Sequence, residues 1–312
     1  MNMNDYVIKI LVKSYKKKWF KMFKIFIIYR NFILRYCDPV IKFRLNNKYL
    51  LMNLSHQLPI YLVQHKLYDT AIPRIINIIK SNEKLFIVDV GANIGDTSAL
   101  IINANPNVSI LCVEGNPLFI NLLKLNYKDD NRVTVEESFC SDILEDNKIS
   151  LDTKRGTATI NSDPKNSTNF SFLTLDDIIQ KHNEFSKIDF IKIDTDGFDY
   201  KVLRGSNSTI AQNKPLIFFE LDKSFLIKNN EEIMSIFNYF EHHEYQAFLV
   251  YDNYGFLIGL FTFEQIHLVE NIINYVDDKR MYLDILMVKD FNLAKKIYKT
   301  EVESIKLILN SN

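Results

Sequence analysis

The chain has 312 residues, of which 47% are hydrophobic and 24% charged, and this is enough apolar material for a sizeable globular core. Its 38 basic and 38 acidic side chains balance, which argues against a globally basic nucleic-acid-binding protein. The three cysteines lie far apart without a CxxC pair, which argues against a zinc knuckle or a disulfide framework and favours a reducing, cytoplasmic setting.

Basic side chains gather at the N-terminus. Residues 1–36 contain nine Lys and Arg residues and a single acid, Asp5. Residues 6–36 have a helical pattern in which lysines recur at spacings of three and four, at Lys9, Lys13, Lys17, Lys21 and Lys24. A basic amphipathic helix of this kind can make peripheral contact with the anionic inner face of a membrane. The alternative is a helix that packs on the body of the protein with its lysines solvated.

The domain organisation follows from this segment and from the more regular pattern after it. No stretch is long and apolar enough to predict a transmembrane helix, and the N-terminus does not have the pattern of a signal peptide. We expect a basic amphipathic extension over residues 1–49 and a main domain over residues 50–312, with a cofactor-binding core at about 84–290.

From about residue 70, apolar strands alternate with helices. The expected strands are 85–90, 108–113, 133–135, 188–193, 215–221, 245–251 and 282–288. The expected helices are 96–103, 117–126 and 231–240. The alternation predicts an α/β fold with a mostly parallel, seven-stranded, doubly wound sheet of the Rossmann-like type and an N-terminal helical extension. The polar segment Asn147–Ser171 predicts a hairpin or a loop insertion.

The first strand leads into a turn that is typical of a nucleoside-binding site. The strand ends at Asp89-Val90-Gly91, and Gly95 immediately precedes a helix that begins near Asp96. Glycines in such a turn let the backbone bend sharply and approach a ligand. The next strand ends in Glu114, 23 residues after Gly91, where a carboxylate can accept hydrogen bonds from both hydroxyls of a ribose.

The spacing within this turn favours S-adenosylmethionine over a dinucleotide. Position 93 is Asn93 and not glycine, so the GxGxxG pattern of a pyrophosphate site is absent. Asp89 and Asp96 flank the turn, and their charge suits a cationic sulfonium and an amino group better than a pyrophosphate. A nicotinamide-dependent dehydrogenase is therefore disfavoured, and no nucleotide P-loop follows the turn.

A second group of acids follows the fourth strand. Asp194, Asp196 and Asp199 lie at this strand end, and the fifth strand ends at Glu220 and Asp222. Carboxylates at neighbouring strand ends can orient a substrate hydroxyl, act as a general base or hold a divalent metal. The alternative is that Lys192 pairs with one of the acids and the others are ordinary loop charges.

These segments together resemble the FkbM family of methyltransferases. The matching pieces are VDVGANIGDTS (Val88–Ser98), VEGNPLFINLLKLN (Val113–Asn126), LTLDDII (Leu173–Ile179), IDFIKIDTDGFDYKVLRG (Ile188–Gly205) and FFELD (Phe218–Asp222). The resemblance covers roughly residues 50–290. Much of the family has Glu where this chain has Asp196 and Asp199, so the resemblance leaves the role of Asp196 less defined.

The resemblance implies a Rossmann-like class I methyltransferase that transfers a methyl group from S-adenosylmethionine to an oxygen, typically a hydroxyl of a sugar, a glycan or a related natural product. The expected cofactor-binding residues are Asp89, Gly91, Asn93, Gly95, Asp96, Glu114, Asn116 and Phe139. The expected catalytic residues are Asp194, Asp196 and His65, with His56 as a further candidate base. A divalent metal bound by Asp194 and Glu220 is compatible with the pattern but is not required by it.

Two other functions remain open on these residues. Asp194-Thr195-Asp196 fits the DxD pattern of metal-dependent glycosyltransferases, although that function gives the glycine turn no role. A non-catalytic binding protein that retains the methyltransferase fold would keep the turn and lack an acceptor reaction. The sequence does not define the acceptor or the oligomeric state.

Overall fold

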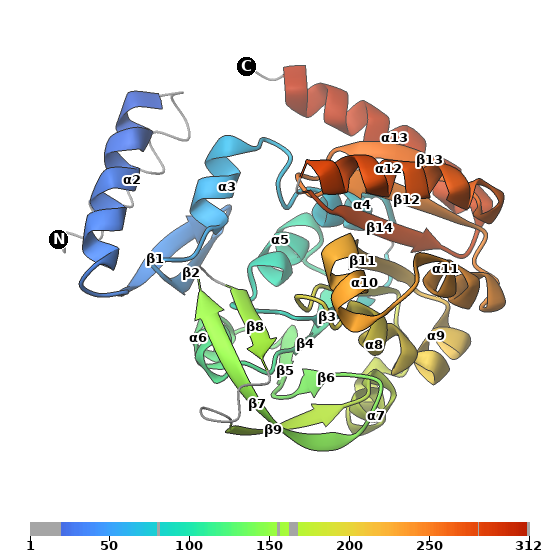
Figure 1. Ribbon diagram of the computed structural model, residues 1–312, viewed down its shortest axis with the longest axis horizontal. Helices are drawn as coiled ribbons and strands as arrows, with labels where there is room; N and C mark the ends of the chain where they lie inside the picture. Colours follow the sequence, from blue (N-terminus) through green and yellow to red (C-terminus); the bar gives the residue numbers. More distant parts are fainter. Residues whose placement is uncertain (1–19, 80–81, 155–156, 162–167, 280, 311–312) are drawn as a thin grey trace.

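The computed structural model describes residues 20–79, 82–154, 157–161, 168–279 and 281–310. Within these residues a large twisted sheet lies between two layers of helices, and a small sheet and an N-terminal unit flank it (Figure 1). This three-layer arrangement confirms the α/β fold class that the alternating pattern predicts.

The main sheet contains eight strands in the described part of the chain. Their bounds are β3 Leu85–Val90, β4 Val108–Val113, β5 Val133–Glu136, β10 Phe190–Ile193, β11 Leu216–Leu221, β12 Ala247–Asp252, β13 Leu257–Phe261 and β14 Leu283–Val288. The spatial order is β13-β12-β14-β11-β10-β3-β4-β5. All seven expected strands are present, and β13 pairs with the outer side of β12 as an additional edge. The predicted number of strands was therefore one too small.

Strand direction determines where a ligand can bind. β5, β4, β3, β10 and β11 are parallel, and β14 is antiparallel to both β11 and β12. The chain runs outward from β3 through β4 to β5 and then returns to the other side of β3 as β10. This reversal is a topological switch point, and doubly wound sheets bind ligands in the crevice at the carboxyl ends of the strands there.

Helices cover both faces of this sheet. Their bounds are α3 Leu58–Gln64, α4 Ala71–Ile79, α5 Asp96–Ala104, α6 Pro117–Tyr127, α7 Leu175–Lys181, α8 Asp199–Arg204, α9 Asn207–Asn213, α10 Lys223–Asn229, α11 Ile233–His242, α12 Ile266–Asp278 and α13 Phe291–Asn310, with short 3-10 helices at Asn183–Phe185 and Phe263–Gln265. One apolar cluster joins the sheet to α4, α5, α6 and α13, and another joins its opposite face to α7–α12. Burial of strands on both faces explains why they read as continuous apolar runs in the sequence.

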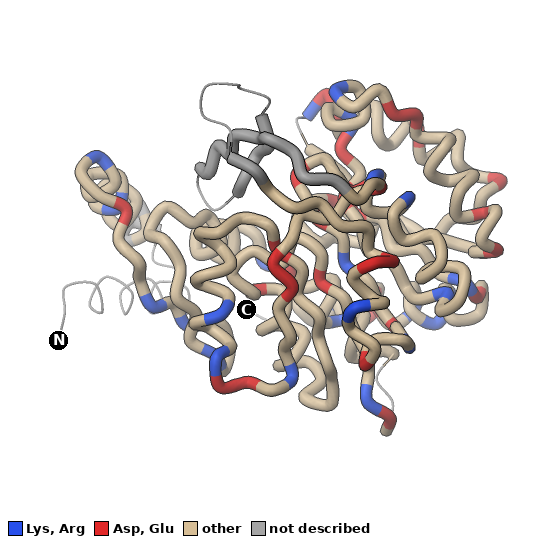
Figure 2. The backbone as a smooth tube through the Cα atoms, turned by 90° about the horizontal axis from the view of Figure 1, so that it is seen from below, with Lys and Arg blue, Asp and Glu red and all other residues tan. Residues whose placement is uncertain are grey.

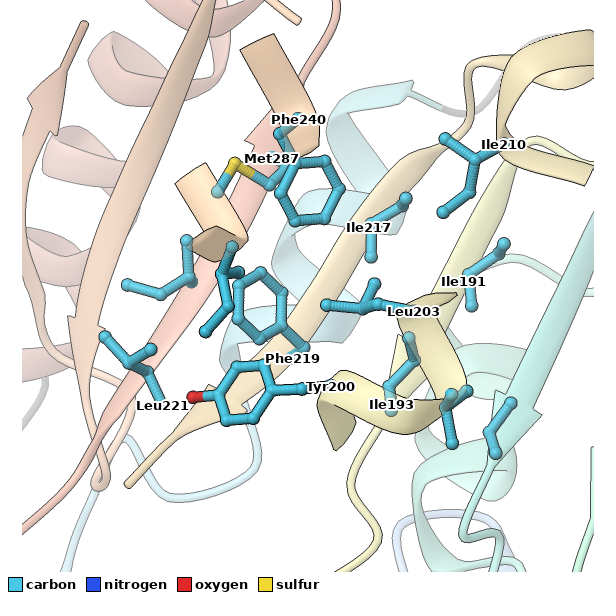
Figure 3. Close-up of a cluster of buried hydrophobic side chains, with 14 of the residues drawn as sticks. Ile191, Ile193, Tyr200, Leu203, Ile210, Ile217, Phe219, Leu221, Phe240 and Met287 are labelled. Carbon is cyan, nitrogen blue, oxygen red and sulfur yellow. The ribbon is translucent and has the colours of Figure 1, made fainter. Parts of the chain in front are cut away.

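Figure 3 shows part of the second cluster, in which side chains from β10, β11 and the covering helices interlock. Phe219 of β11 stacks on Phe240 at a ring-centroid distance of 5.7 Å and meets the edge of Tyr200 at 6.3 Å. Aromatic pairs in these geometries add about 0.5–1.5 kcal/mol to the free energy of burying their area. This packing makes the centre of the sheet a rigid support for the loops at its carboxyl edge.

A smaller sheet forms where the polar insertion was predicted. Its four strands within the described residues are β6 Phe139–Cys140, β7 Glu145–Lys154, β8 Thr157–Asn161 and β9 Thr168–Leu173, in the order β6-β9-β7-β8. β7 pairs with both β8 and β9 in antiparallel fashion, so the segment is a set of hairpins rather than an unstructured loop. The hairpin alternative of the prediction is confirmed.

The N-terminal unit comprises α2 (Phe20–Leu34) and a hairpin of β1 (Val40–Leu45) and β2 (Lys48–Asn53). Of the predicted 6–36 helix, Phe20–Leu34 is helical and residues 35–36 form a turn, and residues 1–19 lie outside the described residues. The domain boundary expected at residue 49 falls inside this hairpin and stays a prediction. None of the helices in the described part of the chain has the length and apolar character that a membrane span requires.

A buried ion pair joins the C-terminal helix α13 to α4, which covers the same face of the sheet. Arg74 of α4 forms three hydrogen bonds of 2.9–3.1 Å with Glu301 of α13, and its Nη2 also donates to the carbonyl oxygen of Gly255 at 2.9 Å. Glu301 is completely buried. Removal of one partner would leave an uncompensated charge in the interior.

We expect Glu301→Ala to destabilise the protein by about 3–5 kcal/mol, because Arg74 would lose its counter-charge. For a chain of this size the melting temperature should fall by roughly 10 °C, which differential scanning calorimetry would measure. Glu303→Ala, at an exposed position of the same helix, is the control and should melt close to the wild type. Equal melting temperatures for the two variants would contradict the assignment.

Candidate functional site

A cavity of about 560 Å³ opens over the carboxyl ends of β3, β4 and β10, at the switch point of the main sheet. The loops after these strands form its walls, together with residues after β5 and the segment that contains α3. Ligand pockets usually have volumes of about 300–1,000 Å³, so this cavity can hold a molecule of nucleoside cofactor size.

The turn after β3 touches the loop after β10. Gly91 has a φ of +75°, and a Cβ atom there would lie 1.8 Å from the backbone carbonyl oxygen of Asp194. Only glycine allows this approach, which explains its place at the end of the strand. Asn93 also has a positive φ, of 51°, and its backbone N–H donates to Glu114 Oε2 at 2.8 Å.

Glu114 forms part of the cavity wall at the end of β4. Its Oε1 accepts a hydrogen bond from the backbone N–H of Asn116 at 2.8 Å, so both carboxylate oxygens are held by main-chain donors. Burial raises the pKa of this carboxyl, and the hydrogen bonds from Asn116 and Asn93 oppose that shift. The side chain is therefore fixed in position while it lines the cavity.

An aromatic wall stands next to Glu114. A Cβ atom on Gly115 would lie 2.3 Å from the ring of Phe139, so the absence of a side chain at 115 admits this ring. Phe139 stacks on Phe172 at 5.3 Å and so connects the cavity to the small sheet through the pairing of β6 with β9. The neighbouring Ser138 is buried and lines the cavity. Among the described residues its hydroxyl has no hydrogen-bond partner.

Lys192 of β10 contacts both the turn after β3 and the loop after β10. Its Nζ donates to the carbonyl oxygen of Gly91 at 2.9 Å and lies 3.3 Å from Asp89 Oδ1 and 3.4 Å from Asp194 Oδ2. Burial opposes the charge, but the neighbouring carboxylates Asp194 and Asp89 outweigh it and raise the pKa of Lys192. The lysine is therefore charged and connects the turn after β3, residues 91–95, to the loop after β10, residues 194–199, which we call the acid loop.

More acids lie beside this ion pair. A second cavity of about 80 Å³ shares Tyr68, Asp69, Lys192 and Asp194 with the first and is also lined by the acids Glu220 and Asp284. Burial is the main cause that raises the pKa values of Asp69, Glu220 and Asp284, followed by repulsion from neighbouring carboxylates. Among the described residues, no group of three or more His, Cys, Asp or Glu side chains has an arrangement that could hold a metal ion.

The structure brings most of the predicted site residues together. Those that line the large cavity are Gly91, Asn93, Asp96, Glu114, Phe139, Asp194 and Asp196. The buried His56 lines this cavity as well. Its Nδ1 accepts the backbone N–H of Leu58 at 3.2 Å, and burial lowers its pKa.

Four predicted residues lie outside this lining. Asp89 is completely buried under the turn, where it accepts a hydrogen bond from Ser98, and Gly95 accepts one from Tyr127. The side chain of Asn116 caps α6 by accepting the N–H of Leu118 at 2.9 Å. The ring of His65 stacks on Tyr254 at 3.7 Å. Their proposed roles in cofactor binding and catalysis stay predictions, and their contacts support the loops around the cavity.

The sequence reasoning did not assign Lys192 to the site. Its signal was a lysine inside the apolar strand FIKI, because charged residues are rarely buried without a partner. Tyr68 and Asp69, which lie upstream of the predicted core, line both cavities.

The strand order and the acid-lined cavity at the switch point define a Rossmann-like methyltransferase fold. The family model of the methyltransferase FkbM domain matches residues 89–257, which is more than half of the chain. The chain therefore belongs to the FkbM methyltransferase family, and the resemblance found in the sequence is confirmed.

Several solved structures are similar to this chain. A methyltransferase FkbM from Methylobacillus flagellatus KT has 20% identity and a TM-score of 0.41, with 55% of this chain and 41% of that chain covered. Precorrin-6y C5,15-methyltransferase from Geobacter metallireducens GS-15 has 15% identity and a TM-score of 0.36, with coverages of 69% and 86%. M. jannaschii TYW2 in complex with AdoMet has 13% identity and a TM-score of 0.39, with coverages of 80% and 86%. The chain thus spans less than half of the first of these proteins. A search of curated proteins gives no match.

The acid loop contains one carboxyl that titrates near neutrality. Asp199 is buried at the start of α8, and its Oδ2 accepts the N–H of Gly197 at 3.2 Å. Burial, followed by the charge of Asp194, raises its pKa from 3.8 to about 7. The folded protein thus binds a proton that the unfolded chain releases, so this group contributes stability that is complete below about pH 4 and is lost as the pH rises through about 7.

We expect Asp199→Asn to gain stability relative to the wild type as the pH rises from about 5 to about 8, since the amide stays neutral and can still accept the Gly197 N–H. The difference in melting temperature between variant and wild type should grow by a few degrees over this range in thermal denaturation experiments. Asp278→Asn, at a largely exposed carboxylate, is the control. A difference that does not change with pH would contradict the raised pKa.

Proposed function

We propose that the protein is an S-adenosylmethionine-dependent O-methyltransferase that methylates a hydroxyl of a sugar, a glycan or a related natural product in the cytoplasm. The observation that carries the proposal is the acid-lined cavity at the switch point of a sheet whose chain belongs to the FkbM methyltransferase family. The fold alone would not select a reaction, so the argument depends on the residues of the site.

The shape and hydrogen-bonding groups of the cavity fit the cofactor. Glu114 has main-chain donors on both oxygens and retains lone pairs that can accept the two ribose hydroxyls. The orphaned hydroxyl of Ser138 supports the same interpretation, because buried polar groups normally have a partner and a bound adenosine could supply one. Phe139 offers an apolar surface beside them for a base.

The charge of the cavity also suits S-adenosylmethionine, whose sulfur is positively charged. Its described lining contains five carboxylates: Asp69, Asp96, Glu114, Asp194 and Asp196. It contains one ammonium group, that of Lys192, which already pairs with acids. Burial raises the pKa values of Asp96 and Glu114, and a cationic ligand would favour their ionised forms. When bound, S-adenosylmethionine supplies an electrophilic methyl group on a positively charged sulfur.

The residues beside this site suit a hydroxylated acceptor. Asp194 faces both cavities, its side chain is 53% exposed, and Lys192 holds one of its oxygens, so it can accept the proton of an acceptor hydroxyl. Glu220, Asp284 and Asn253 line the second cavity and provide acceptors for further hydroxyls. His56 is neutral, but its Nδ1 lone pair already accepts the N–H of Leu58, so its other ring nitrogen is a donor and Asp194 is the better candidate base.

Isothermal titration calorimetry with S-adenosylmethionine tests the cofactor assignment. We expect micromolar binding to the wild type and a dissociation constant about 10- to 100-fold higher for Glu114→Ala, because hydrogen bonds to a charged group contribute roughly 1.5–3 kcal/mol. Glu137→Ala removes an exposed carboxylate outside the cavity and should bind as the wild type does. Absence of binding to folded wild-type protein would reject the proposal.

Asp194→Asn tests the catalytic assignment. With a panel of sugars and glycans as acceptors, we expect kcat to fall by about 10²- to 10⁴-fold while the affinity for S-adenosylmethionine changes little, because a general base acts only in the chemical step. Asp129→Asn, at a highly exposed carboxylate, is the control. An unchanged kcat would remove Asp194 from the mechanism, and cofactor binding without transfer to any acceptor would favour the non-catalytic alternative.

A further inference from the structure

The outer side of α2 carries a row of exposed apolar side chains. Ile25, Ile28 and Phe32 are 66%, 70% and 54% exposed and follow one another at spacings of three and four, which places them on one side of the helix. Tyr36, 76% exposed, lies just beyond the helix with its ring 5.4 Å from that of Phe32. Large apolar side chains grouped in this way on a surface mark a site of interaction.

The opposite side of α2 is fixed to the body. Phe23 and Phe26 pack against Ile60 of α3, and Arg30 donates from Nε to the carbonyl oxygen of Leu54 at 2.8 Å and from Nη2 to that of Ser55 at 2.5 Å. These contacts set the orientation of the helix, so that the apolar row points away from the body. In Figure 1, α2 stands at the edge of the molecule beside β1 and β2, on the side away from the main sheet.

Basic and aromatic side chains lie on the outer face of the neighbouring hairpin. β1 alternates exposed and buried positions, which puts Val40, Lys42 and Arg44 on one exposed side. Tyr49 of β2 is 53% exposed, and the charges of Lys42 and Arg44 lie 4.8 Å and 5.9 Å from the centre of its ring. The combination of cationic tips and amphipathic rings is typical of surfaces that contact the headgroup region of a bilayer.

The charge of the N-terminal unit favours an anionic lipid surface over a second copy of the chain as its binding partner. Residues 20–54 contain seven Lys and Arg residues and one acid, Asp38, although the whole chain has no net charge. Blue segments mark this part of the backbone in Figure 2. A second copy of the chain would bring the exposed Arg35, Lys42 and Arg44 of two copies together, which repulsion opposes. An anionic lipid surface offers the complementary charge together with an apolar interior.

We propose that the exposed face of α2 and the outer face of the β1–β2 hairpin form a docking surface for a bilayer that contains anionic lipids. Ile25, Ile28 and Phe32 would enter the boundary between headgroups and acyl chains, and Lys42 and Arg44 would pair with lipid phosphates and carboxylates. The proposal concerns surface contact and does not depend on methyl transfer. The same chain segment continues into α3, whose Leu58 and Tyr61 line the large cavity, so the docking surface adjoins one wall of the site.

Vesicle flotation with the full chain tests this surface. Vesicles of phosphatidylcholine alone are compared with vesicles that contain about 30% phosphatidylserine. We expect recovery with the anionic vesicles only, and a loss of recovery when the salt concentration is raised, because screening weakens the lysine and arginine contacts.

Two double variants separate the apolar and the charged contributions. Ile28→Ser with Phe32→Ser, and Lys42→Glu with Arg44→Glu, should each lower the partition coefficient at least about tenfold, since each basic residue near an anionic surface contributes about 1 kcal/mol. Leu307→Ser and Lys128→Glu change equally exposed residues elsewhere and should leave recovery unchanged. Circular dichroism and the melting temperature establish that each variant is folded.

Tryptophan fluorescence tests the same membrane contact in the wild-type protein. The only tryptophan of the chain is Trp19, which immediately precedes α2, so its fluorescence should shift to shorter wavelength with anionic vesicles and not with neutral ones. Recovery with neither kind of vesicle, equal recovery with both, or double variants that float as the wild type does would overturn the proposal. Dimerisation in solution that Ile28→Ser with Phe32→Ser abolishes, without flotation, would assign the surface to a second copy instead.

Discussion

Lys192 carries its charge inside a parallel strand, where an unpaired ammonium would cost several kcal/mol. The structure compensates that cost with Asp89 from the strand beside it, Asp194 from the loop above it and the carbonyl oxygen of Gly91 from the facing turn. These partners come from both sides of the switch point. The loops that would hold the cofactor and the acceptor are therefore positioned by one buried charge, and the surrounding elements supply its neighbours.

Acids around Lys192 line the two cavities. Asp69, Glu220 and Asp284 lie in the second cavity, where burial raises their pKa values and favours their neutral forms. A neutral carboxyl can donate as well as accept a hydrogen bond, which suits the hydroxyl groups of a polyol. The two cavities share Asp69 and Asp194, and burial raises the pKa values of carboxyls in both, so each presents acids that can donate as well as accept hydrogen bonds.

Much of the fold could be predicted because buried parallel strands leave continuous apolar runs, as at β3 and β4, whose bounds match the predicted ones. The β1–β2 hairpin was missed, although Val40–Leu45 alternates and Asn46 supplies the turn with a positive φ. The sequence offered a pair between Lys192 and an acid as an alternative, and the structure confirms it, but the partner Asp89 could not be predicted, because it depends on β10 pairing with β3 in a register that aligns the two residues. Those strands are about a hundred residues apart, and no local pattern encodes their register.

The contact between Gly91 and the Asp194 carbonyl has a consequence for engineering. Any residue larger than glycine at position 91 would push against the Asp194 backbone and displace one of the two loops. Directed evolution toward new acceptors would therefore keep Gly91 fixed while the residues of the loop after β10 are varied. Among the described residues the small sheet borders the cavity through Phe139 and Cys140 of β6, and its hairpins are a separate place to graft new specificity.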